Sequence, residues 1–303
     1  MPSPVKAFFQ SRLSDVESFF TNPNNHLAKF LKTSEGPDKV AKFADAAFDT
    51  VGEFAQLAGL SQRGIDGIDK GRAVVKTGRD VFALPNILRG IIPAFVSHSK
   101  NCYHLTKGLC QGNKVVRLKA ENPDPKKRKH TDVTVGKKEM VLALGANFGK
   151  SVATSTYMLG FGGCRPIQTI YKYGRDKQGN PYIKMSEATL KFGNAFPIVM
   201  MINHVGGLLG GGFEIAYQDV AFGREVKHSR QARGDDEQAR IDKAYGFYKH
   251  KVIEEFVGGL EKFLELLMDI VHVMGKAAPA WFRLPTTLGI GCCAIYKEWL
   301  KTA

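Results

Sequence analysis

The sequence predicts a mainly α-helical protein, and three observations support that prediction. Apolar residues recur every three or four positions in several long segments, which is the spacing of one face of a helix. The runs with strand propensity are short. In the most regular segments, charged residues fall between the apolar positions, as expected for helices with one buried and one solvated side. The 303 residues are enough for one large domain or for two smaller ones.

The N-terminal region, residues 1–113, contains the clearest helical pattern of the chain at residues 39–58, KVAKFADAAFDTVGEFAQLA. Its apolar residues lie three or four positions apart, and charged residues separate them. The apolar set is Val40, Phe43, Ala44, Ala47, Phe48, Val51, Phe54, Ala55 and Ala58. This pattern predicts an amphipathic helix that buries one face.

Two prolines and a basic stretch define the next part of the chain. Pro85 and Pro93 interrupt a glycine-rich segment, so we expect two short, bent helices at about 67–82 and 86–97. Residues 114–139 are rich in Lys and Arg and contain two more prolines. We interpret them as a basic linker or exposed loop that separates an N-terminal from a C-terminal region.

The C-terminal region, residues 140–303, contains three apolar segments, at 140–164, 192–213 and 252–295. The last of these begins with an amphipathic pattern typical of a helix. Between the first two, a pair of short runs with strand propensity flanks a Gly-Asn-Pro turn, which predicts a small β-hairpin near 168–185.

Two of the apolar segments have the length of a membrane span. Residues 192–213 contain no charged side chain, and residues 140–164 contain only Lys150. About 20 apolar residues cross the hydrocarbon layer as a helix, so the two segments are compatible with a helical membrane hairpin. They are equally compatible with two buried helices of a soluble domain, and the composition does not choose between these interpretations.

The glycines of residues 206–212, GGLLGGG, are predicted to form a packing surface. Gly206 and Gly210 are four residues apart, as are Gly207 and Gly211, and small residues at this spacing let helices approach closely. Their spacing does not match that of a dinucleotide-binding loop. His204 lies just before them, and we interpret it as an interior histidine of the same membrane or helix-packing segment.

One segment resembles a phosphate-binding loop but has the wrong spacing. In VLALGANFGKS, three residues separate Gly145 from Gly149, whereas the loop requires four, and Leu144 occupies the position of its first glycine. Lys150 would be the phosphate-binding lysine, and Asp269 the magnesium partner. A nucleotide-dependent enzyme is therefore a remote alternative, and we predict neither catalytic residues nor a cofactor.

The cysteines and histidines predict neither a disulfide framework nor a metal site. The chain has five cysteines, an odd number, which fits a reducing compartment or a cytosolic face. One irregular cluster, consisting of His98, Cys102, His104 and Cys110, lacks the paired spacing of structural zinc sites.

The formal net charge of +14 favours anionic partners, among which charge alone does not choose. The densest basic run is KKRK, that is Lys126, Lys127, Arg128 and Lys129. Without interleaved aromatic residues it does not suggest base stacking, so nucleic acid is a disfavoured partner. We predict that this run contacts an anionic membrane surface, where each basic residue contributes about 1 kcal/mol.

Five segments, taken in order, resemble the chlamydial inclusion membrane proteins. They are SFFTNPNNHLAKFLKTSEGPDKVAKFADAA, GRDVFALPNILRGIIPAF, TYMLGFGGCRPI, MMINHVGGLLGGGFEIA and LEKFLELLMDIV. The resemblance covers roughly residues 18–100 and 155–293. The family usually has a strongly apolar two-lobed segment, which in this chain is interrupted by Lys150, Asn203 and His204.

The resemblance implies a type III secreted protein with an uncleaved export signal near its N-terminus. It also implies insertion into the membrane of the pathogen-containing vacuole, with part of the protein facing the host cytosol. Membrane lipids, host proteins or lipid-rich organelles, and a bacterial secretion chaperone are the implied partners. The start of the chain, MPSPVKAFFQSRLSDVESFF, fits such a route because it lacks the apolar core of a secretory signal peptide.

We therefore expect a virulence effector of the vacuole membrane that binds membranes and host components without catalysis. A soluble helical module that binds lipid or nucleic acid is the alternative from another class.

Overall fold

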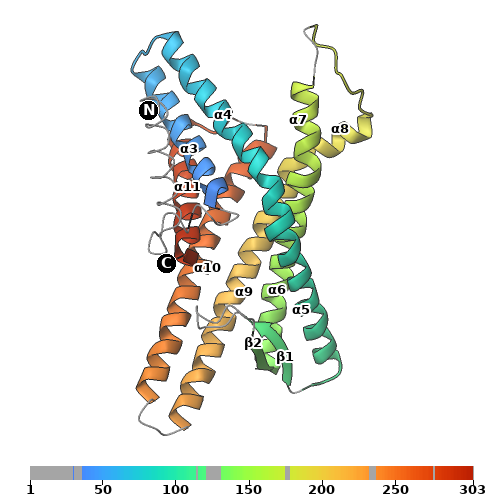
Figure 1. The fold of residues 1–303 in the computed structure, drawn as a ribbon, viewed down its shortest axis with the longest axis vertical. Coiled ribbons are helices and arrows are strands. Elements are labelled where there is room, and N and C mark those ends of the chain that lie inside the picture. Colours follow the sequence, from blue (N-terminus) through green and yellow to red (C-terminus); the bar gives the residue numbers. More distant parts are fainter. Residues whose placement is uncertain are drawn as a thin grey trace, which may run out of the picture.

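The computed structural model describes residue 30 and residues 36–113, 115–120, 131–174, 178–231, 237–275 and 277–302. These residues form long helices and one small two-stranded sheet (Figure 1). The prediction of a mainly α-helical protein is confirmed.

The helices follow one another with short connections. In chain order the elements are α3 (Gly36–Leu57), α4 (Gln62–Asn86), the π-helix η1 (Ile87–Ile91), α5 (Ile92–Cys110), β1 (Val115–Ala120), β2 (Thr131–Gly136), α6 (Lys137–Tyr157), the π-helix η2 (Met158–Cys164), α7 (Arg165–Tyr173), α8 (Glu187–Asn194), α9 (Phe196–Gln231), α10 (Glu237–Val273) and α11 (Ala280–Thr302).

The long helices pack as a series of neighbours in the spatial order α5, α6, α9, α10, α11, α3 and α4 (Figure 1). Residue contacts between α6 and α9 run in opposite directions along the chain: Gly145 meets Phe213, and Gly160 meets Met200. The two helices are therefore antiparallel. The same holds for α9 and α10, where Lys262 meets Gly207 and Tyr248 meets Asp219.

Helix α3 coincides closely with the helix predicted at residues 39–58. Asp38 lies in its first turn, where a carboxylate interacts favourably with the helix dipole. Gly59 follows its last turn with a φ of 70°, a conformation that glycine adopts without strain. The N–H groups of Gly59 and Leu60 donate to the carbonyls of Gln56 and Ala55, so the end of α3 is capped by the backbone.

The two prolines at 85 and 93 do not break the chain into short helices. Helices α4 and α5 continue into each other through the π turn of η1, from Gln62 to Cys110. A proline ring clashes with the carbonyl four residues earlier in an α-helix, and the wider π turn before Pro93 relieves that clash. The π-helix η2 relieves the corresponding clash of Pro166, so α6, η2 and α7 also form one continuous helical run.

The small β-hairpin predicted near 168–185 is wrong. Residues Arg165–Tyr173 are helical, because α7 extends the run from α6 and because Pro166 suits the first turn of a helix. A hairpin forms instead inside the predicted linker at 114–139, where β1 and β2 pair antiparallel from Val115 opposite Gly136 to Ala120 opposite Thr131.

This hairpin is anchored in a buried apolar cluster at one end of α5 and α6. Val135 of β2 is fully buried with Leu105, Met140 and Ala143. Val116 of β1 packs against this cluster and closely approaches Gly108 of α5. Burial of these apolar side chains stabilises the hairpin. The basic composition of the segment does not indicate this burial.

Of the two segments of the predicted membrane hairpin, only the one at 192–213 lies in a helix with the length and hydropathy of a membrane span. Within the described residues, one helical segment, Glu187–Gln231, is long and apolar enough to cross a membrane, with a mean hydropathy of 1.3 over its best window. The segment at 140–164 does not reach that level, because Lys150, Asn147 and several hydroxyl side chains dilute it. The two segments do pack together, as α6 and α9.

Candidate functional site

Gly206 and Gly210 of α9 lie against α6, where the backbones of the two helices approach each other closely. A methyl group placed on Gly149 of α6 would lie 2.6 Å from the Gly210 Cα atom and 2.7 Å from the Gly206 carbonyl oxygen. Such distances are far below van der Waals contact, so the two backbones touch only because neither helix has side chains here.

Gly207 and Gly211, the other predicted pair, lie against α10. A methyl group on Gly207 would lie 3.2 Å from the Cγ atom of Lys262, and one on Gly211 would lie 3.4 Å from a Glu255 carboxylate oxygen. These glycines therefore leave room for charged side chains of α10 to pass along α9. Helix α9 is thus held between α6 and α10 by two glycine surfaces.

The third side of α9 carries an exposed apolar stripe. Ile198, Ile202, Val205, Leu209 and Phe213 recur every three or four residues, and each is between 39% and 55% exposed. Side chains at this spacing share one face of a helix. That face turns away from α10 and borders α6, because the glycines occupy the sides that contact those helices.

Helix α6 continues this stripe on the same side of the molecule. Phe213 of α9 lies over Gly145 of α6, and Gly145 is flanked on its own helix by the exposed Val141 and Phe148. The stripe of α6 ends at Leu159, at the start of η2. We call the eight side chains of these two stripes the outer face: Val141, Phe148, Leu159, Ile198, Ile202, Val205, Leu209 and Phe213.

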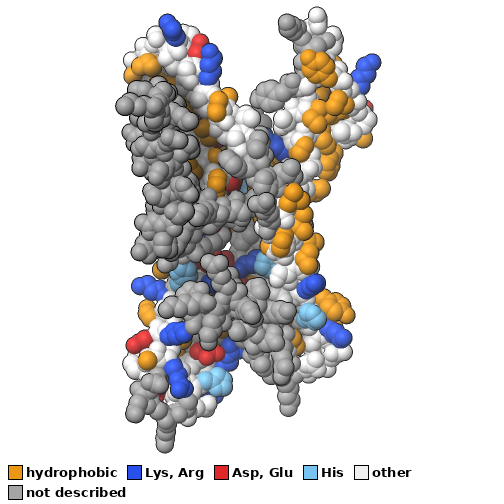
Figure 2. Space-filling view, viewed as in Figure 1, with side chains coloured by type: hydrophobic (Ala, Val, Ile, Leu, Met, Phe, Trp, Pro, Cys, Tyr) orange, Lys and Arg blue, Asp and Glu red, His pale blue; other side chains and the backbone are white. Residues whose placement is uncertain are grey.

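Other helices also expose apolar side chains. Helix α10 presents Phe256, Leu260, Phe263, Ile270 and Val273. Figure 2 shows hydrophobic side chains gathered along the right-hand edge of the molecule, over α6, α7 and α8. Contiguous exposed apolar surface of this kind marks an interaction site in a folded protein.

The charged side chains of α6, α9 and α10 turn toward one another instead. The ammonium group of Lys150 on α6 lies 3.1 Å from a carboxylate oxygen of Glu214 on α9 and 2.7 Å from one of Glu255 on α10. Burial by itself would lower the pKa of Lys150, but the two carboxylates outweigh burial and raise it. Lys150 thus connects three helices as a permanent cation.

This pairing bears on the phosphate-binding interpretation of the same segment. Glu214 and Glu255 surround the ammonium group that a phosphate-binding loop would offer to a phosphate. Asp269, the carboxylate considered as its magnesium partner, contacts His204 and not Lys150. Within the part of the chain that the structure describes, the two residues belong to different clusters.

His204 lies almost fully buried between two carboxylates of α10. Its Nε2 atom is 3.0 Å from a Glu265 oxygen, and its Nδ1 atom is 2.8 Å from an Asp269 oxygen. The N–H directions deviate from both oxygens, so we describe these contacts as ion pairs and not as aligned hydrogen bonds. The adjacent Asn203 is buried too, and its side-chain NH₂ donates to the Ala153 carbonyl of α6.

The same carboxylates reach a third helix. Lys42 of α3 pairs with Glu265 and lies 2.5 Å from a carboxylate oxygen of Glu261, and Lys262 lies 2.8 Å from a Glu265 oxygen. We call this set the junction: Lys42, His204, Glu261, Lys262, Glu265 and Asp269. It joins α3, α9 and α10 through charged groups, of which Lys42, His204 and Glu261 are buried and the other three are partly buried.

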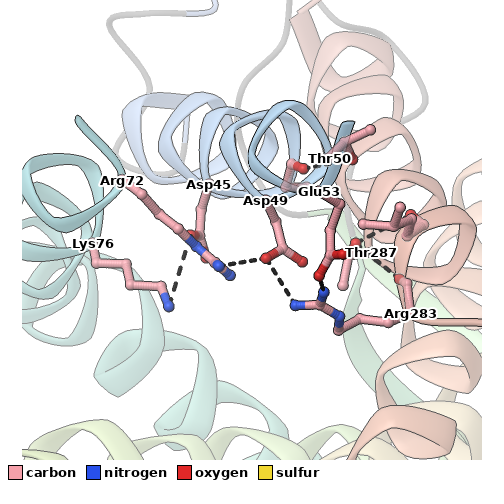
Figure 3. A network of polar contacts seen from close by, with 10 residues as sticks. Asp45, Asp49, Thr50, Glu53, Arg72, Lys76, Arg283 and Thr287 are labelled. Carbon is pink, nitrogen blue, oxygen red and sulfur yellow. Dashed lines mark hydrogen bonds and ion pairs between the residues drawn. The ribbon is translucent and has the colours of Figure 1, made fainter. Parts of the chain in front are cut away.

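A separate network joins α3 to α4 and α11 (Figure 3). Asp49 of α3 accepts hydrogen bonds from Arg72 of α4 and from Arg283 of α11. Figure 3 shows Asp45 and Glu53 extending this row along α3, toward Arg72 and Arg283 respectively. Burial by itself would lower the pKa of Arg72, but Asp45 and Asp49 raise it.

The histidines and cysteines considered as a metal cluster all lie on α5 but do not converge. The Nδ1 atom of His98 is 3.1 Å from the side-chain oxygen of Asn147 on α6, whereas Cys110 is exposed at the end of α5. Among the residues described, no group of three or more potential metal ligands comes together. Burial lowers the pKa of His98.

The predicted residues of the site fall into two groups. The four glycines and His204 lie together on α9, as described above. The basic run Lys126, Lys127, Arg128 and Lys129 lies outside the described residues.

The carboxylates of α10 were not predicted as a cluster, and Asp269 was considered only as a magnesium partner. A signal existed: Glu254, Glu261, Glu265 and Asp269 recur at helical spacing, opposite the apolar stripe.

No protein-family model, curated protein or solved structure matches this chain.

Proposed function

We propose that this protein associates with a membrane through the outer face, and that it acts by binding and not by catalysis. The observation that carries the proposal is the distribution of polarity. Around the Lys150 cluster, α6 and α9 turn the charged Lys150 and Glu214 toward other helices, whereas the large apolar side chains of the outer face are exposed. A soluble helix packs in the opposite sense, with its apolar side inward.

Contact with lipid would stabilise each of these side chains. Complete burial of a Val, Leu, Ile or Phe side chain contributes about 1.5–3 kcal/mol, and these residues are about half-buried already. Each therefore contributes roughly 1 kcal/mol on transfer to hydrocarbon. Eight such side chains together contribute roughly 8 kcal/mol, which lies within the range of about 4–15 kcal/mol that association costs, so electrostatic attraction has to add to the apolar contact.

The outer face lies along one leaflet in this proposal. On α9 it extends from Ile198 to Phe213, which is about 22 Å at 1.5 Å per residue. The hydrocarbon layer is about 30 Å thick, so the stripe is shorter than a span. Only one side of α9 is apolar and exposed, and this is typical of a helix that lies in the membrane plane.

The net charge of +14 supports attachment to an anionic surface. The basic run Lys126, Lys127, Arg128 and Lys129 is proposed to add electrostatic attraction to the lipid headgroups. The resemblance to inclusion membrane proteins supports the cellular setting: a type III secreted effector on the membrane of a pathogen-containing vacuole. Host proteins or lipid-rich organelles would meet its cytosolic side.

A lysine substitution on the outer face tests the proposal. Val205→Lys places a charge in the middle of the stripe, where hydrocarbon would surround it. We expect vesicle flotation of the purified protein with phosphatidylserine-containing vesicles to fall at least tenfold, because burying one ammonium group in lipid costs about 2–3 kcal/mol.

Val74→Lys is the matched control, since Val74 is an exposed valine of α4 that is not part of the outer face. It adds the same charge to the same residue type, so its flotation should equal or exceed that of the unmodified protein. Equal flotation of the Val205→Lys and unmodified proteins would refute the contact with lipid. Vesicles without anionic lipid measure the electrostatic part separately.

A further inference from the structure

The junction contains a histidine whose two ring nitrogens both face carboxylates. A neutral imidazole has one N–H group and one nitrogen lone pair, whereas a carboxylate can only accept a hydrogen. Glu265 lies on one side of the His204 ring and Asp269 on the other, so a neutral ring would leave one carboxylate beside a nitrogen without a proton, whereas a protonated ring places its positive charge within 3.0 Å of both. The arrangement is favourable only when both nitrogens carry a proton.

The carboxylates of the junction differ in the cations beside them. Glu261 and Glu265 pair with lysines, and Lys39 of α3 acts on Glu261 as well. Among the described residues, Asp269 is in ion-pair distance of His204 alone, so a neutral His204 would leave this partly buried carboxylate without a cation. A shielded carboxylate without a cation is destabilising, so the contact between α9 and α10 depends on this proton.

We propose that the proton on His204 is a latch: with it, α9 stays closed on α10 at the junction, and without it, these two helices separate there. The latch is local because the other interfaces of α9 do not use this histidine. Lys150 of α6 lies further along α9, already paired with Glu214 and Glu255, and Asn203 holds α6 through a neutral hydrogen bond.

The electrostatic surroundings of His204 favour its protonated form. Burial by itself would lower the pKa of His204, and Lys262 also lowers it, but Asp269 and Glu265 outweigh both and raise it. From α3, Lys42 acts through its pair with Glu265, whose pKa is lowered: burial would raise it, but Lys262 and Lys42 outweigh burial.

The sign of the pH dependence follows from the raised pKa. A group whose folded-state pKa lies above its unfolded value stabilises the fold fully below the unfolded value, which is about 6.5 for histidine. That stabilisation is lost as the pH rises through the folded-state pKa of His204. The latch is therefore closed at mildly acidic pH and opens on the alkaline side.

The first experiment measures the charge of His204 directly, by NMR of ¹⁵N-labelled histidine rings in the purified full-length protein at pH 5.5–9.5. His204 should show two protonated nitrogens at pH 6.5 and titrate above that pH. His98, buried beside the neutral Asn147, is the internal comparison and should be neutral at pH 6.5. The assignment uses His204→Gln and His98→Gln.

The second experiment measures the opening by hydrogen exchange, corrected for the intrinsic pH dependence of the exchange rate. Amides of α9 near His204 and of α10 near Glu265 should lose at least tenfold protection between pH 6.5 and pH 9. The contact between α5 and α6 around Asn147 should not change. In His204→Gln the junction should be weakly protected at both pH values, and His98→Gln should behave as the unmodified protein.

Two results would overturn the latch. One is a neutral His204 ring at pH 6.5. Once the His204 signal is assigned, this measurement uses only the unmodified protein. The other is junction protection that does not depend on pH although His204 titrates. Neither result bears on membrane attachment, because the junction and the outer face occupy different sides of α9.

Discussion

Gly210 shows how much a single residue decides in this protein. A methyl group on it would lie 2.8 Å from the backbone nitrogen of Lys150, and backbone atoms cannot move aside without displacing the helix. Gly212, two positions later on the same helix, has no atom within 4 Å of the equivalent point. The pair therefore separates the effect of packing from the effect of helix propensity.

We expect Gly210→Ala to lower the free energy of unfolding by about 1–2 kcal/mol, because overpacking at the seam exceeds the gain in helix propensity. Gly212→Ala should raise it by about 0.5–1 kcal/mol through propensity alone. Urea unfolding followed by circular dichroism measures both. If the two variants gain stability alike, α6 and α9 are not in backbone contact at Gly210.

The spacing of these glycines was readable in the sequence, but their partners were not. The four-residue intervals predict one packing surface on the helix, whereas the structure divides the glycines between two neighbouring helices. Which surface meets α6 and which meets α10 depends on residues distant in the chain, such as Gly149 and Lys262. His204 is a similar case, because its carboxylate neighbours on α10 lie more than 60 positions away.

At the scale of elements, the ion pairs of the helices differ greatly in how far water can reach them. Lys150 joins three helices in a largely shielded position, whereas Lys191 pairs with Glu187 on the surface of α8, where both side chains are more than three-quarters exposed. Shielded pairs are costly to break, and exposed pairs contribute little.

Lys150→Met should therefore lower the free energy of unfolding by about 2–3 kcal/mol at pH 7, since it leaves Glu214 and Glu255 facing each other without a cation. The loss should shrink as the pH falls and Glu214 becomes protonated, since burial raises the pKa of Glu214 and Lys150 is the main group that lowers it in the unmodified protein. Lys191→Met, the same change on the surface, should cost less than about 0.5 kcal/mol. Equal costs at both positions would show that Lys150 is solvated.

Elements also explain where the sequence-based predictions failed. Propensity favoured a hairpin near residues 168–185, but the continuous run of α6, η2 and α7 kept those residues helical as far as Tyr173. Basic composition suggested a loop at 114–139, but burial of Val135 beside Met140 favoured strands there. In both cases packing against a neighbour outweighed the local preference.

At the scale of the whole molecule, three sets of charged side chains lie between helices, while several helices expose stripes of apolar side chains. The junction, the Lys150 cluster and the arginine network of Figure 3 together connect α3, α4, α6, α9, α10 and α11. The exposed stripes of α6, α9 and α10 leave large apolar side chains without cover among the described residues. In water without lipid, surfaces of this kind associate.

We expect the lipid-free protein to form oligomers that grow with concentration in sedimentation velocity experiments. The double variant Ile202→Lys and Leu209→Lys should shift the protein toward the monomer, because two like charges would then face each other across a contact between outer faces. Added lipid vesicles should have the same effect on the unmodified protein by covering the outer face. A protein that is monomeric at all concentrations would contradict this view of the surface.

The sequence by itself determined the helical class, the helix at 39–58, the uncharged stretch at 192–213 and the glycine spacing. These are properties of residues three or four positions apart, and helix geometry relates such residues without reference to the rest of the chain. Only the tertiary structure decided which charges pair. Lys42 and Glu261 are 219 positions apart, and no local pattern links them. Their contact exists because helix packing brings both into one shielded space, where a charge is stable only beside its opposite.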